Sequence, residues 1–264
     1  MKKQKFTRSA NTRQSIRKMA GAGTLAMALA SGVAQAALHD RGGGLVYDDV
    51  LDVTWLADAN YARTSGYDED GRMTWSEAMT WVEQLTYDHV VGGVTIDTYD
   101  DWRLPALLDQ GSASYKWSNS GSDTGYNVRT VGEDGTVYSE LAYMYYFNLG
   151  FKGYYANTGA YQSDFGIFGD GTSGGERNGL GPNNVIVNLQ SFVYWSGTAY
   201  GPLSATDAWN FNTGDGHQNY YGQNNWLYAW AVRSGDVAAI PEPTSAALFG
   251  VGLALLATMR RIRL

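Results

Sequence analysis

Residues 192–236 read FVYWSGTAYGPLSATDAWNFNTGDGHQNYYGQNNWLYAWAVRSGD, and this stretch decides the fold. It holds four runs of aromatic and β-branched residues, separated by Gly, Pro, Asn and Asp, at 192–198, 208–213, 217–221 and 226–233. This pattern predicts an antiparallel sheet. Side chains alternate along a strand, so Tyr228, Trp230 and Val232 share one side of the sheet, and one face of it is expected to form the core.

The N-terminus predicts export. Residues 1–36 carry seven basic residues and no acid, followed by an apolar run from Met19 to Ala30 and by Ala34-Gln35-Ala36. A basic region, an apolar region and an A-x-A site in this order are typical of a secretory signal peptide, with cleavage expected after Ala36. The alternative is an amphipathic N-terminal helix.

The C-terminus predicts a membrane-directed tail. Pro241, Glu242 and Pro243 precede an apolar run at 244–259, and Arg260, Arg261 and Arg263 follow it. The run would span about 24 Å as a helix, which is short of the roughly 30 Å hydrocarbon core and favours a transient anchor. The arginines would stay on the cytoplasmic side, leaving the residues before Pro241 outside.

These terminal residues resemble the PEP-CTERM sorting signal of Gram-negative bacteria, which would occupy 240–264. The resemblance implies that an exosortase recognises the Pro-Glu-Pro triplet and removes the helix, releasing the protein to the cell surface or extracellular matrix. The alternative is a simple tail anchor that keeps the protein in the inner membrane.

Between these ends, residues 37–239 are expected to form one domain. Residues 37–240 hold nine bases and 25 acids, a net charge of about −16. Because phosphate binding needs clustered Lys and Arg, this charge argues against nucleic acid, and it suits polysaccharide, Ca²⁺ or a cationic surface. The chain has no cysteine, so the domain must be stabilised by its own core.

The N-terminal half predicts a hairpin, a helix and a second, shorter helix. Residues 45–47 and 53–56 form the expected hairpin strands around an Asp-rich turn. Thr74 and Glu77 form a capping box, which predicts a helix with Trp75 and Val82 on its apolar face. Residues 88–100 are expected to be a loop or an edge strand, and Pro105 to open a short helix over 106–110.

Asp68, Asp70 and Arg103 are the candidate site residues in this half. Asp68 and Asp70 lie in an acidic loop that resembles the start of a calcium loop without its later ligands, so we expect a solvated turn, with Ca²⁺ as the alternative and no other cofactor. Arg103 is expected to place its guanidinium on a carboxylate or on backbone carbonyls; the alternative is an anionic ligand.

Two glycine-rich insertions, about 111–137 and 151–186, flank a predicted helix at 139–149 with Ser139 as N-cap. Long loops in compact domains are often functional, and aromatic rings among Gly, Asn and Ser can stack on sugars. Equally, the rings could fold the loop over the sheet. The candidate ligand-binding residues are Tyr154, Tyr155, Tyr161, Phe165, Tyr220 and Tyr221.

Several motifs together resemble the Lcl C-terminal-domain group of bacterial surface proteins. They are T-W-S-E-A-M at Thr74, D-W-R-L-P at Asp101, Y-W-S-G-T at Tyr194, A-W-N-F at Ala208 and A-W-A-V-R at Ala229. The resemblance implies an α+β, C-type-lectin-like fold, with two helices on a twisted antiparallel sheet and with paired terminal strands. The residues assigned to this scaffold are Trp75, Trp102, Arg103, Trp195, Trp209, Trp230 and Arg233.

Function carries over from this resemblance only in part. Calcium-dependent lectins of this fold use an E-P-N or Q-P-D loop and a W-N-D strand, whereas here Phe211 follows Trp209 and Asn210. Formylglycine-generating enzymes share the fold but use cysteines. His217 lies in a tight turn and is expected to be solvated. We therefore expect a non-enzymatic, exported module that binds polysaccharide or another surface component; the alternatives are a structural matrix protein and a polysaccharide-acting enzyme.

Overall fold

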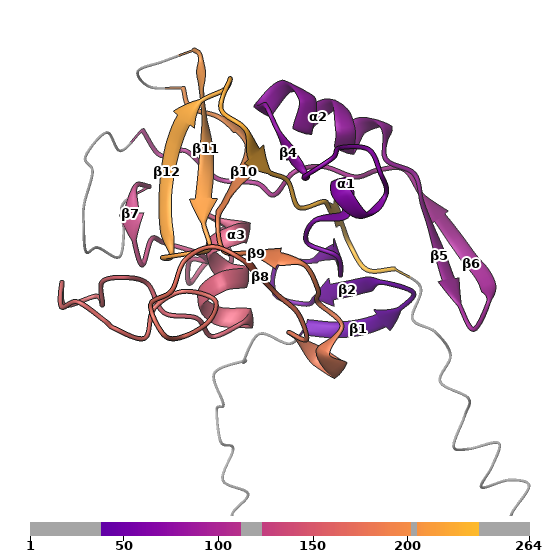
Figure 1. Cartoon of the computed structure of the whole chain (residues 1–264), viewed down its shortest axis with the longest axis horizontal. Coiled ribbons are helices and arrows are strands. Elements are labelled where there is room, and N and C mark those ends of the chain that lie inside the picture. The colour runs from indigo at the N-terminus through magenta and orange to yellow at the C-terminus, as the bar shows by residue number, and fades with distance from the viewer. Residues whose placement is uncertain (1–37, 112–122, 202–204, 238–264) are drawn as a thin grey trace, which may run out of the picture. The chain divides into compact units, whose positions relative to one another are not determined.

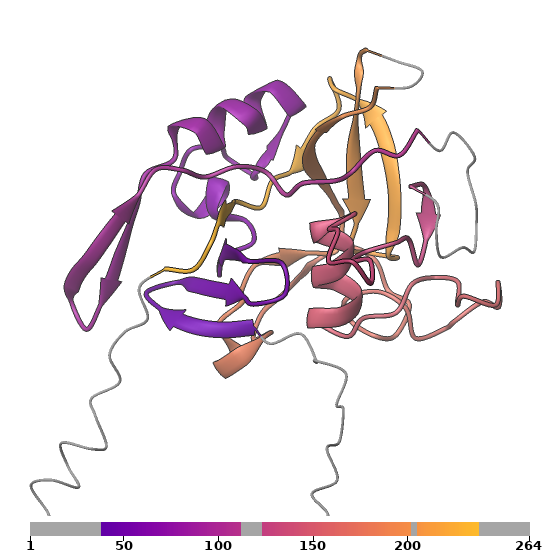
Figure 2. The ribbon, with the colours of Figure 1, turned by 180° about the vertical axis from the view of Figure 1, so that it is seen from behind.

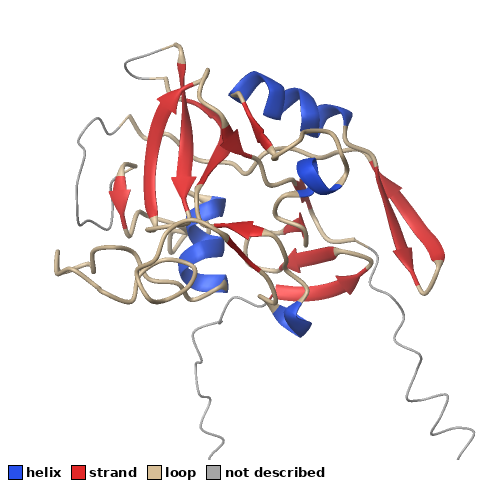
Figure 3. Ribbon diagram, viewed as in Figure 1, coloured by secondary structure: helices blue, strands red, loops and turns tan. Residues whose placement is uncertain are grey.

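The protein is a mixed α+β domain built mostly of strands, with few and short helices (Figure 1; Figure 3). The computed structural model describes residues 38–111, 123–201 and 205–237. The predicted signal peptide and the predicted sorting signal lie outside these residues. None of the described helices is long and apolar enough to cross a bilayer.

Six strands form the larger sheet, in the order β4-β13-β10-β11-β12-β7. Its centre is the predicted meander of β10 (Val193–Ala199), β11 (Asp207–Asn212) and β12 (His217–Gly222), which pair antiparallel. The outer strands are short: β4 (Arg72–Met73), β13 (Leu227–Tyr228) and β7 (Gly125–Tyr126). Because β7 comes from the first glycine-rich insertion, that insertion is part of the sheet.

A second sheet joins the two ends of the domain in the order β1-β2-β3-β14. The predicted hairpin is present as β2 (Leu45–Asp48) and β3 (Val53–Leu56), and β14 (Val232–Ser234) pairs with β3. The strand β1 (Leu38–Gly42) was not predicted from the sequence.

The prediction of one continuous antiparallel strand over 226–233 was wrong. The segment divides into β13, which runs parallel to β10, and β14 in the other sheet. Between them Leu56 N donates to Ala231 O (3.1 Å) and Trp230 Nε1 donates to Leu56 O (2.6 Å), so the chain crosses from one sheet to the other. Residues 229–232 are all buried at this crossing, so both faces of the segment lie in the core and not one face alone, as the alternation had predicted.

Core side chains cover both faces of the larger sheet. On one face, α2 (Trp75–Gln84) packs Trp81 and Val82 with Trp195. On the other face, α3 (Glu140–Tyr143) and the π-helix η1 (Met144–Asn148) pack with Tyr194, Phe211 and Trp230. Alternation along β10 and β11 therefore separates two cores. The views from front and back show that α2 and α3 lie near different ends of these strands (Figure 1; Figure 2).

The helix ends agree with the predicted caps. Thr74 Oγ1 accepts from Glu77 N, and the Glu77 carboxylate accepts from Thr74 N, which completes the capping box. Ser139 Oγ accepts from Ala142 N (3.2 Å) at the start of α3. The predicted helix at 139–149 is present but changes to π geometry after its first turn.

The predicted helix at 106–110 was wrong, and the predicted loop or edge strand at 88–100 was right only in that the segment contains strands. Residues 106–110 are extended, because Ala106 N donates to the Glu140 carboxylate and Leu107 N donates to Thr198 Oγ1 instead of forming helical bonds. Residues 87–99 form a hairpin, β5 (Tyr87–Val91) and β6 (Val94–Tyr99), which turns at two glycines with positive φ. The remaining short elements are β8 (Glu176–Arg177), β9 (Leu189–Gln190), α1 (Tyr61–Thr64) and the 3₁₀-helix η2 (Pro182–Asn184).

The residues assigned to the scaffold are held by specific bonds. Trp195, Trp209 and Trp230 are fully buried. The indole N–H groups find acceptors, as buried indoles require: Trp75 donates to Ser196 O, Trp102 to Tyr99 O, Trp195 to Met73 O and Trp209 to Asp109 Oδ2. Arg233 makes a two-bond fork onto Asp101 (2.7 and 2.9 Å).

Candidate functional site

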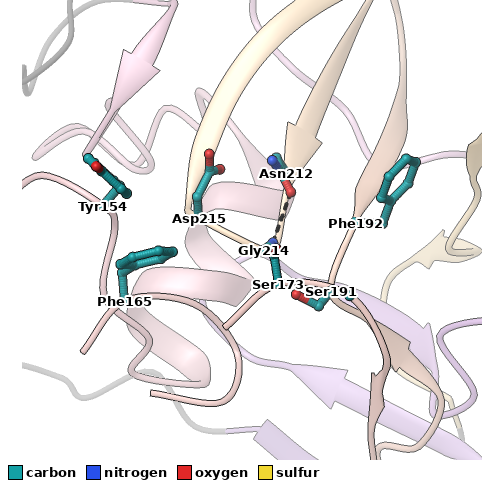
Figure 4. Close-up of a pocket in the computed structure, with 9 residues that line it drawn as sticks. Tyr154, Phe165, Ser173, Ser191, Phe192, Asn212, Gly214 and Asp215 are labelled. Carbon is teal, nitrogen blue, oxygen red and sulfur yellow. Dashed lines mark hydrogen bonds between the residues drawn. The ribbon is translucent and has the colours of Figure 1, made fainter. Parts of the chain in front are cut away.

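A cleft of about 500 Å³ lies where the second glycine-rich insertion meets the larger sheet. Its walls come from three segments: the insertion, the residues just before β10, and the end of β11 with its turn into β12. The nine residues that line it are Tyr154, Phe165, Ser173, Gly174, Ser191, Phe192, Asn212, Gly214 and Asp215. We refer to this site as the cleft. In Figure 4, Tyr154 and Phe165 lie on one side of the Gly214–Asp215 turn and Phe192 lies on the other.

The floor of the cleft is the turn between β11 and β12. Asn212 Oδ1 accepts from Gly214 N (2.9 Å; Figure 4). Asn212 O accepts from Gly216 N (2.8 Å), and the two bonds close the turn. A Cβ on Gly214 would lie 3.0 Å from Asn212 Oδ1 and 3.2 Å from Ser191 Oγ. Glycine at this position therefore keeps the floor open.

Thr213 ties the second wall to this floor. Its N–H donates to Phe192 O, its hydroxyl lies within hydrogen-bond distance of both Phe192 O and Gln190 O and can donate to either, and Phe192 N donates to its Oγ1. These bonds hold Ser191 and Phe192 beside the turn. Ser191 is buried, and its Oγ has no hydrogen-bond partner among the described residues. A buried hydroxyl without a partner carries a free-energy cost that a ligand can relieve.

The third wall, from the insertion, packs directly on the turn. Tyr154 N donates to Asp215 O (2.8 Å), Ser191 N donates to Gly175 O (2.8 Å), and Gly174 N donates to Ser191 O (3.3 Å). A Cβ on Gly166 would lie 2.5 Å from Gly214 O. The insertion is thus hydrogen-bonded to the β11–β12 turn and to Ser191, and its close contact with Gly214 leaves room only for glycine at position 166.

The aromatic residues predicted in the insertion form one group. Tyr154 is its centre, with ring centroids 4.8 Å from Tyr155, 4.8 Å from Tyr161 and 4.9 Å from Phe165. Phe165 is buried, whereas Tyr161 is 57% exposed. Both interpretations of the insertion therefore hold in part: some rings fold the loop onto the sheet, and others face solvent beside the cleft.

The π-helix η1 is hydrogen-bonded to the insertion that carries this group and to the β11–β12 turn beside it. Tyr145 Oη donates to Lys152 O (2.7 Å) and Tyr146 Oη donates to Gly216 O (2.5 Å). Asn127 N donates to Tyr146 Oη (3.0 Å). Consecutive tyrosines thereby reach the insertion and the β11–β12 turn from the same helical turn, and burial raises the pKa of both phenols.

Asp215 is the one charged side chain among the described residues that line the cleft. Burial raises the pKa of its carboxyl to about 6, against the opposing effect of donors from His217 N (3.1 Å) and Tyr126 Oη (3.4 Å). The expectation of a solvated His217 was wrong. Its ring is partly buried and stacks on Tyr126 (centroids 4.9 Å), and burial lowers its pKa to about 4.

The other candidate residues lie elsewhere. Tyr220 stacks on Tyr200 (centroids 3.8 Å, planes 7° apart) and contacts Trp209, and Tyr221 is 38% exposed further along β12; neither lines the cleft. Asp68 Oδ1 accepts from Asp70 N and Gly71 N, and Asp70 pairs with Arg72, so both carboxylates close their own loop. Within 38–111, 123–201 and 205–237, no group of three or more His, Asp or Glu could hold a metal.

Arg103 makes the bidentate contact expected of a scaffold residue. Its Nη1 and Nη2 donate to the two carboxylate oxygens of Glu140 (2.7 and 2.8 Å), and Nη1 also donates to Leu104 O (3.1 Å). Its backbone N–H and C=O pair with Val232. Arg103 therefore joins the extended segment to α3 and to the second sheet, away from the cleft lining.

Sequence reasoning missed Ser173, Ser191, Phe192, Asn212 and Asp215 as cleft residues. The run Asn212-Thr213-Gly214-Asp215-Gly216 was visible, but it indicates only a turn. Comparison with known proteins adds no relatives: no family model, curated protein or solved structure matches this chain.

Proposed function

We propose that this protein is an exported, non-enzymatic binding module whose cleft takes one sugar unit of an extracellular polysaccharide. The observation that carries the proposal is the composition of the cleft: rings of Tyr154, Phe165 and Phe192 beside the polar groups of Ser191 and Asn212. Binding sites for small ligands combine apolar and aromatic walls with a few fixed polar groups in this way.

The cleft favours binding over hydrolysis. Glycoside hydrolysis in most enzymes uses two carboxyl groups that flank the scissile bond. Asp215 is the one carboxylate among the described residues of the lining. The bonds that hold the three walls together are consistent with a site that is already formed before a ligand arrives.

Export of the domain to the cell surface or matrix is part of the same proposal. The signal peptide at 1–36 and the PEP-CTERM-like tail at 240–264 would send the domain, after exosortase processing, to the cell surface or matrix. Strands β3 and β14, near the two ends of the domain, pair with each other, which agrees with a C-type-lectin-like arrangement.

A glycan-array screen of the full-length chain tests the proposal. We expect binding to one class of extracellular glycan, and we expect Phe165→Ala to weaken it because the ring forms a wall of the cleft. Tyr220→Ala is the matched control: it also removes an aromatic ring, but one outside the cleft. No binding to any glycan or to matrix material of the host, or equal losses in both variants, would refute the proposal.

A further inference from the structure

We infer that the sugar unit taken by the cleft is a protonated amino sugar, whose ammonium group lies at Asp215 and whose ring lies against Tyr154 and Phe165. This inference rests on the proposed function, because it names the class of sugar for the same site. It is carried by the charge of the lining, by the bonding of Asp215 and by the rings beside it.

The charge of the lining favours a cationic sugar over an anionic one. No Lys or Arg is among the nine lining residues, and Asp215 supplies a single negative charge. The nearby bases of the insertion have other partners: Lys152 Nζ pairs with Asp164, and Arg177 donates to Ile167 O and lies over the Phe151 ring. An anionic or sulfated sugar would therefore meet an acid without a compensating base.

The hydrogen bonds of Asp215 leave its charge open to a cationic ligand. Its carboxylate accepts from two neutral donors, His217 N and Tyr126 Oη, and has no ion pair among the described residues. A partly buried carboxylate without a cation is less stable than a paired one, so a cation from a ligand gains more there than at the surface.

The groups beside Asp215 suit the ring and the hydroxyls of an amino sugar. The faces of Tyr154 and Phe165 can attract an ammonium group and also stack on a sugar ring. Ser191 Oγ, which is buried and without a partner among the described residues, and the amide of Asn212 can bond the sugar hydroxyls. A sugar with one amino group and several hydroxyls uses all of these groups, whereas a simple alkylammonium ion leaves the hydroxyl partners unused.

The binding should depend on pH in a defined way. The ammonium group needs Asp215 ionised, so affinity rises as the pH rises through about 6, the pKa to which burial raises this carboxyl. Affinity then falls again where the sugar amine loses its proton. The other titratable groups around Asp215 are Tyr126, Tyr145, Tyr146, Tyr154 and His217, and burial keeps His217 neutral above about pH 4.

The test compares two short oligosaccharides that differ only in the amine. Glucosamine trimer and N-acetylglucosamine trimer are titrated into the full-length chain at 0.15 M salt, which screens long-range attraction to the acidic domain. We expect the glucosamine trimer to bind more tightly. Asp215→Asn should weaken it about 10- to 100-fold, the range for loss of one charge-assisted hydrogen bond.

Asp170→Asn is the matched control. Asp170 is an exposed acid of the same insertion, so this variant removes the same charge from the chain without altering the cleft. Equal weakening in both variants would show nonspecific attraction and overturn the inference. Equal binding of the two trimers, with no loss in Asp215→Asn, would also overturn it but leave the proposed function standing. If no glycan of any class binds, the proposed function itself falls.

The wild-type pH profile gives a second measurement that does not depend on a variant folding. A bell-shaped affinity for the glucosamine trimer with a lower limb near pH 6 supports the inference. A flat profile between pH 5 and 7 contradicts it.

Discussion

Replacing Arg103 by Met should destabilise the domain strongly, because it leaves the Glu140 carboxylate buried without its cation. Glu140 is 4% exposed and accepts three charge-assisted bonds, two from Arg103 and one from Ala106 N. Removing one partner of a buried ion pair costs about 3–5 kcal/mol in free energy of unfolding. The remaining bond from Ala106 N keeps the expected loss near the lower end of that range.

Proton uptake sets an upper limit on this loss. An ordinary glutamate takes up a proton at a cost of about 1.36 kcal/mol for each pH unit above roughly 4.3, which is about 4 kcal/mol at pH 7 and about 1 kcal/mol at pH 5. The penalty for the unpaired charge in Arg103→Met should therefore be about 3 to 4 kcal/mol at pH 7 and should shrink to about 1 kcal/mol at pH 5.

Urea unfolding followed by tryptophan fluorescence measures these changes. The double variant Arg103→Met/Glu140→Gln should recover most of the loss, because the amide oxygen can still accept from Ala106 N. The control is Arg72→Met, which removes a similar fork onto Asp70 at the surface and should cost about 0–1 kcal/mol. The reasoning fails if Arg103→Met costs no more than this control, or if its cost is the same at pH 5 and pH 7.

Two further predictions concern the cleft. Gly166→Ala should abolish glycan binding, because the added Cβ would lie 2.5 Å from Gly214 O. Gly169 has a similar positive φ but open space around it, so Gly169→Ala should retain binding. Equal effects of the two variants in glycan titrations would exclude the contact with Gly214 as the cause. Between pH 4 and 6 the contributions of Asp215 and His217 to stability should oppose each other, because the raised pKa of Asp215 favours the folded state as pH falls and the lowered pKa of His217 favours it as pH rises. Relative to the wild type, the stability of Asp215→Asn should increase more with pH over this range and that of His217→Gln should increase less; slopes identical to the wild type in both variants would contradict this.

Local signals in the sequence predicted local structure well. Thr74 and Glu77 identify the start of α2, and the alternation around Trp195 and Trp209 identifies the strands β10 and β11, because both patterns depend only on neighbouring residues. The errors arose where distant partners compete for the backbone. Glu140 takes the N–H of Ala106, 34 positions away, so the expected helix at 106–110 does not form.

The cleft could be predicted only in part for the same reason. The aromatic residues of the glycine-rich insertion indicated a binding surface around Tyr154, and the structure brings Tyr154 and Phe165 into the lining of the cleft. Ser191 and Asp215 belong to separate segments, and nothing near either residue in the sequence indicates that they share a site. Their proximity depends on the hydroxyl of Thr213 and on the close contact at Gly166, which are tertiary features.

The crossing of the chain at Trp230 makes the domain indivisible. Leu56 in β3 is bonded to Trp230, 174 positions later, and residues 227–234 supply a strand to each sheet. A chain growing from its N-terminus therefore has an open edge on β3 until nearly the whole domain has been synthesised, and such long-range closure slows folding. Ending the chain anywhere between Leu38 and Leu227 removes β13 from one sheet and β14 from the other, so no N-terminal fragment of the domain retains the intact scaffold.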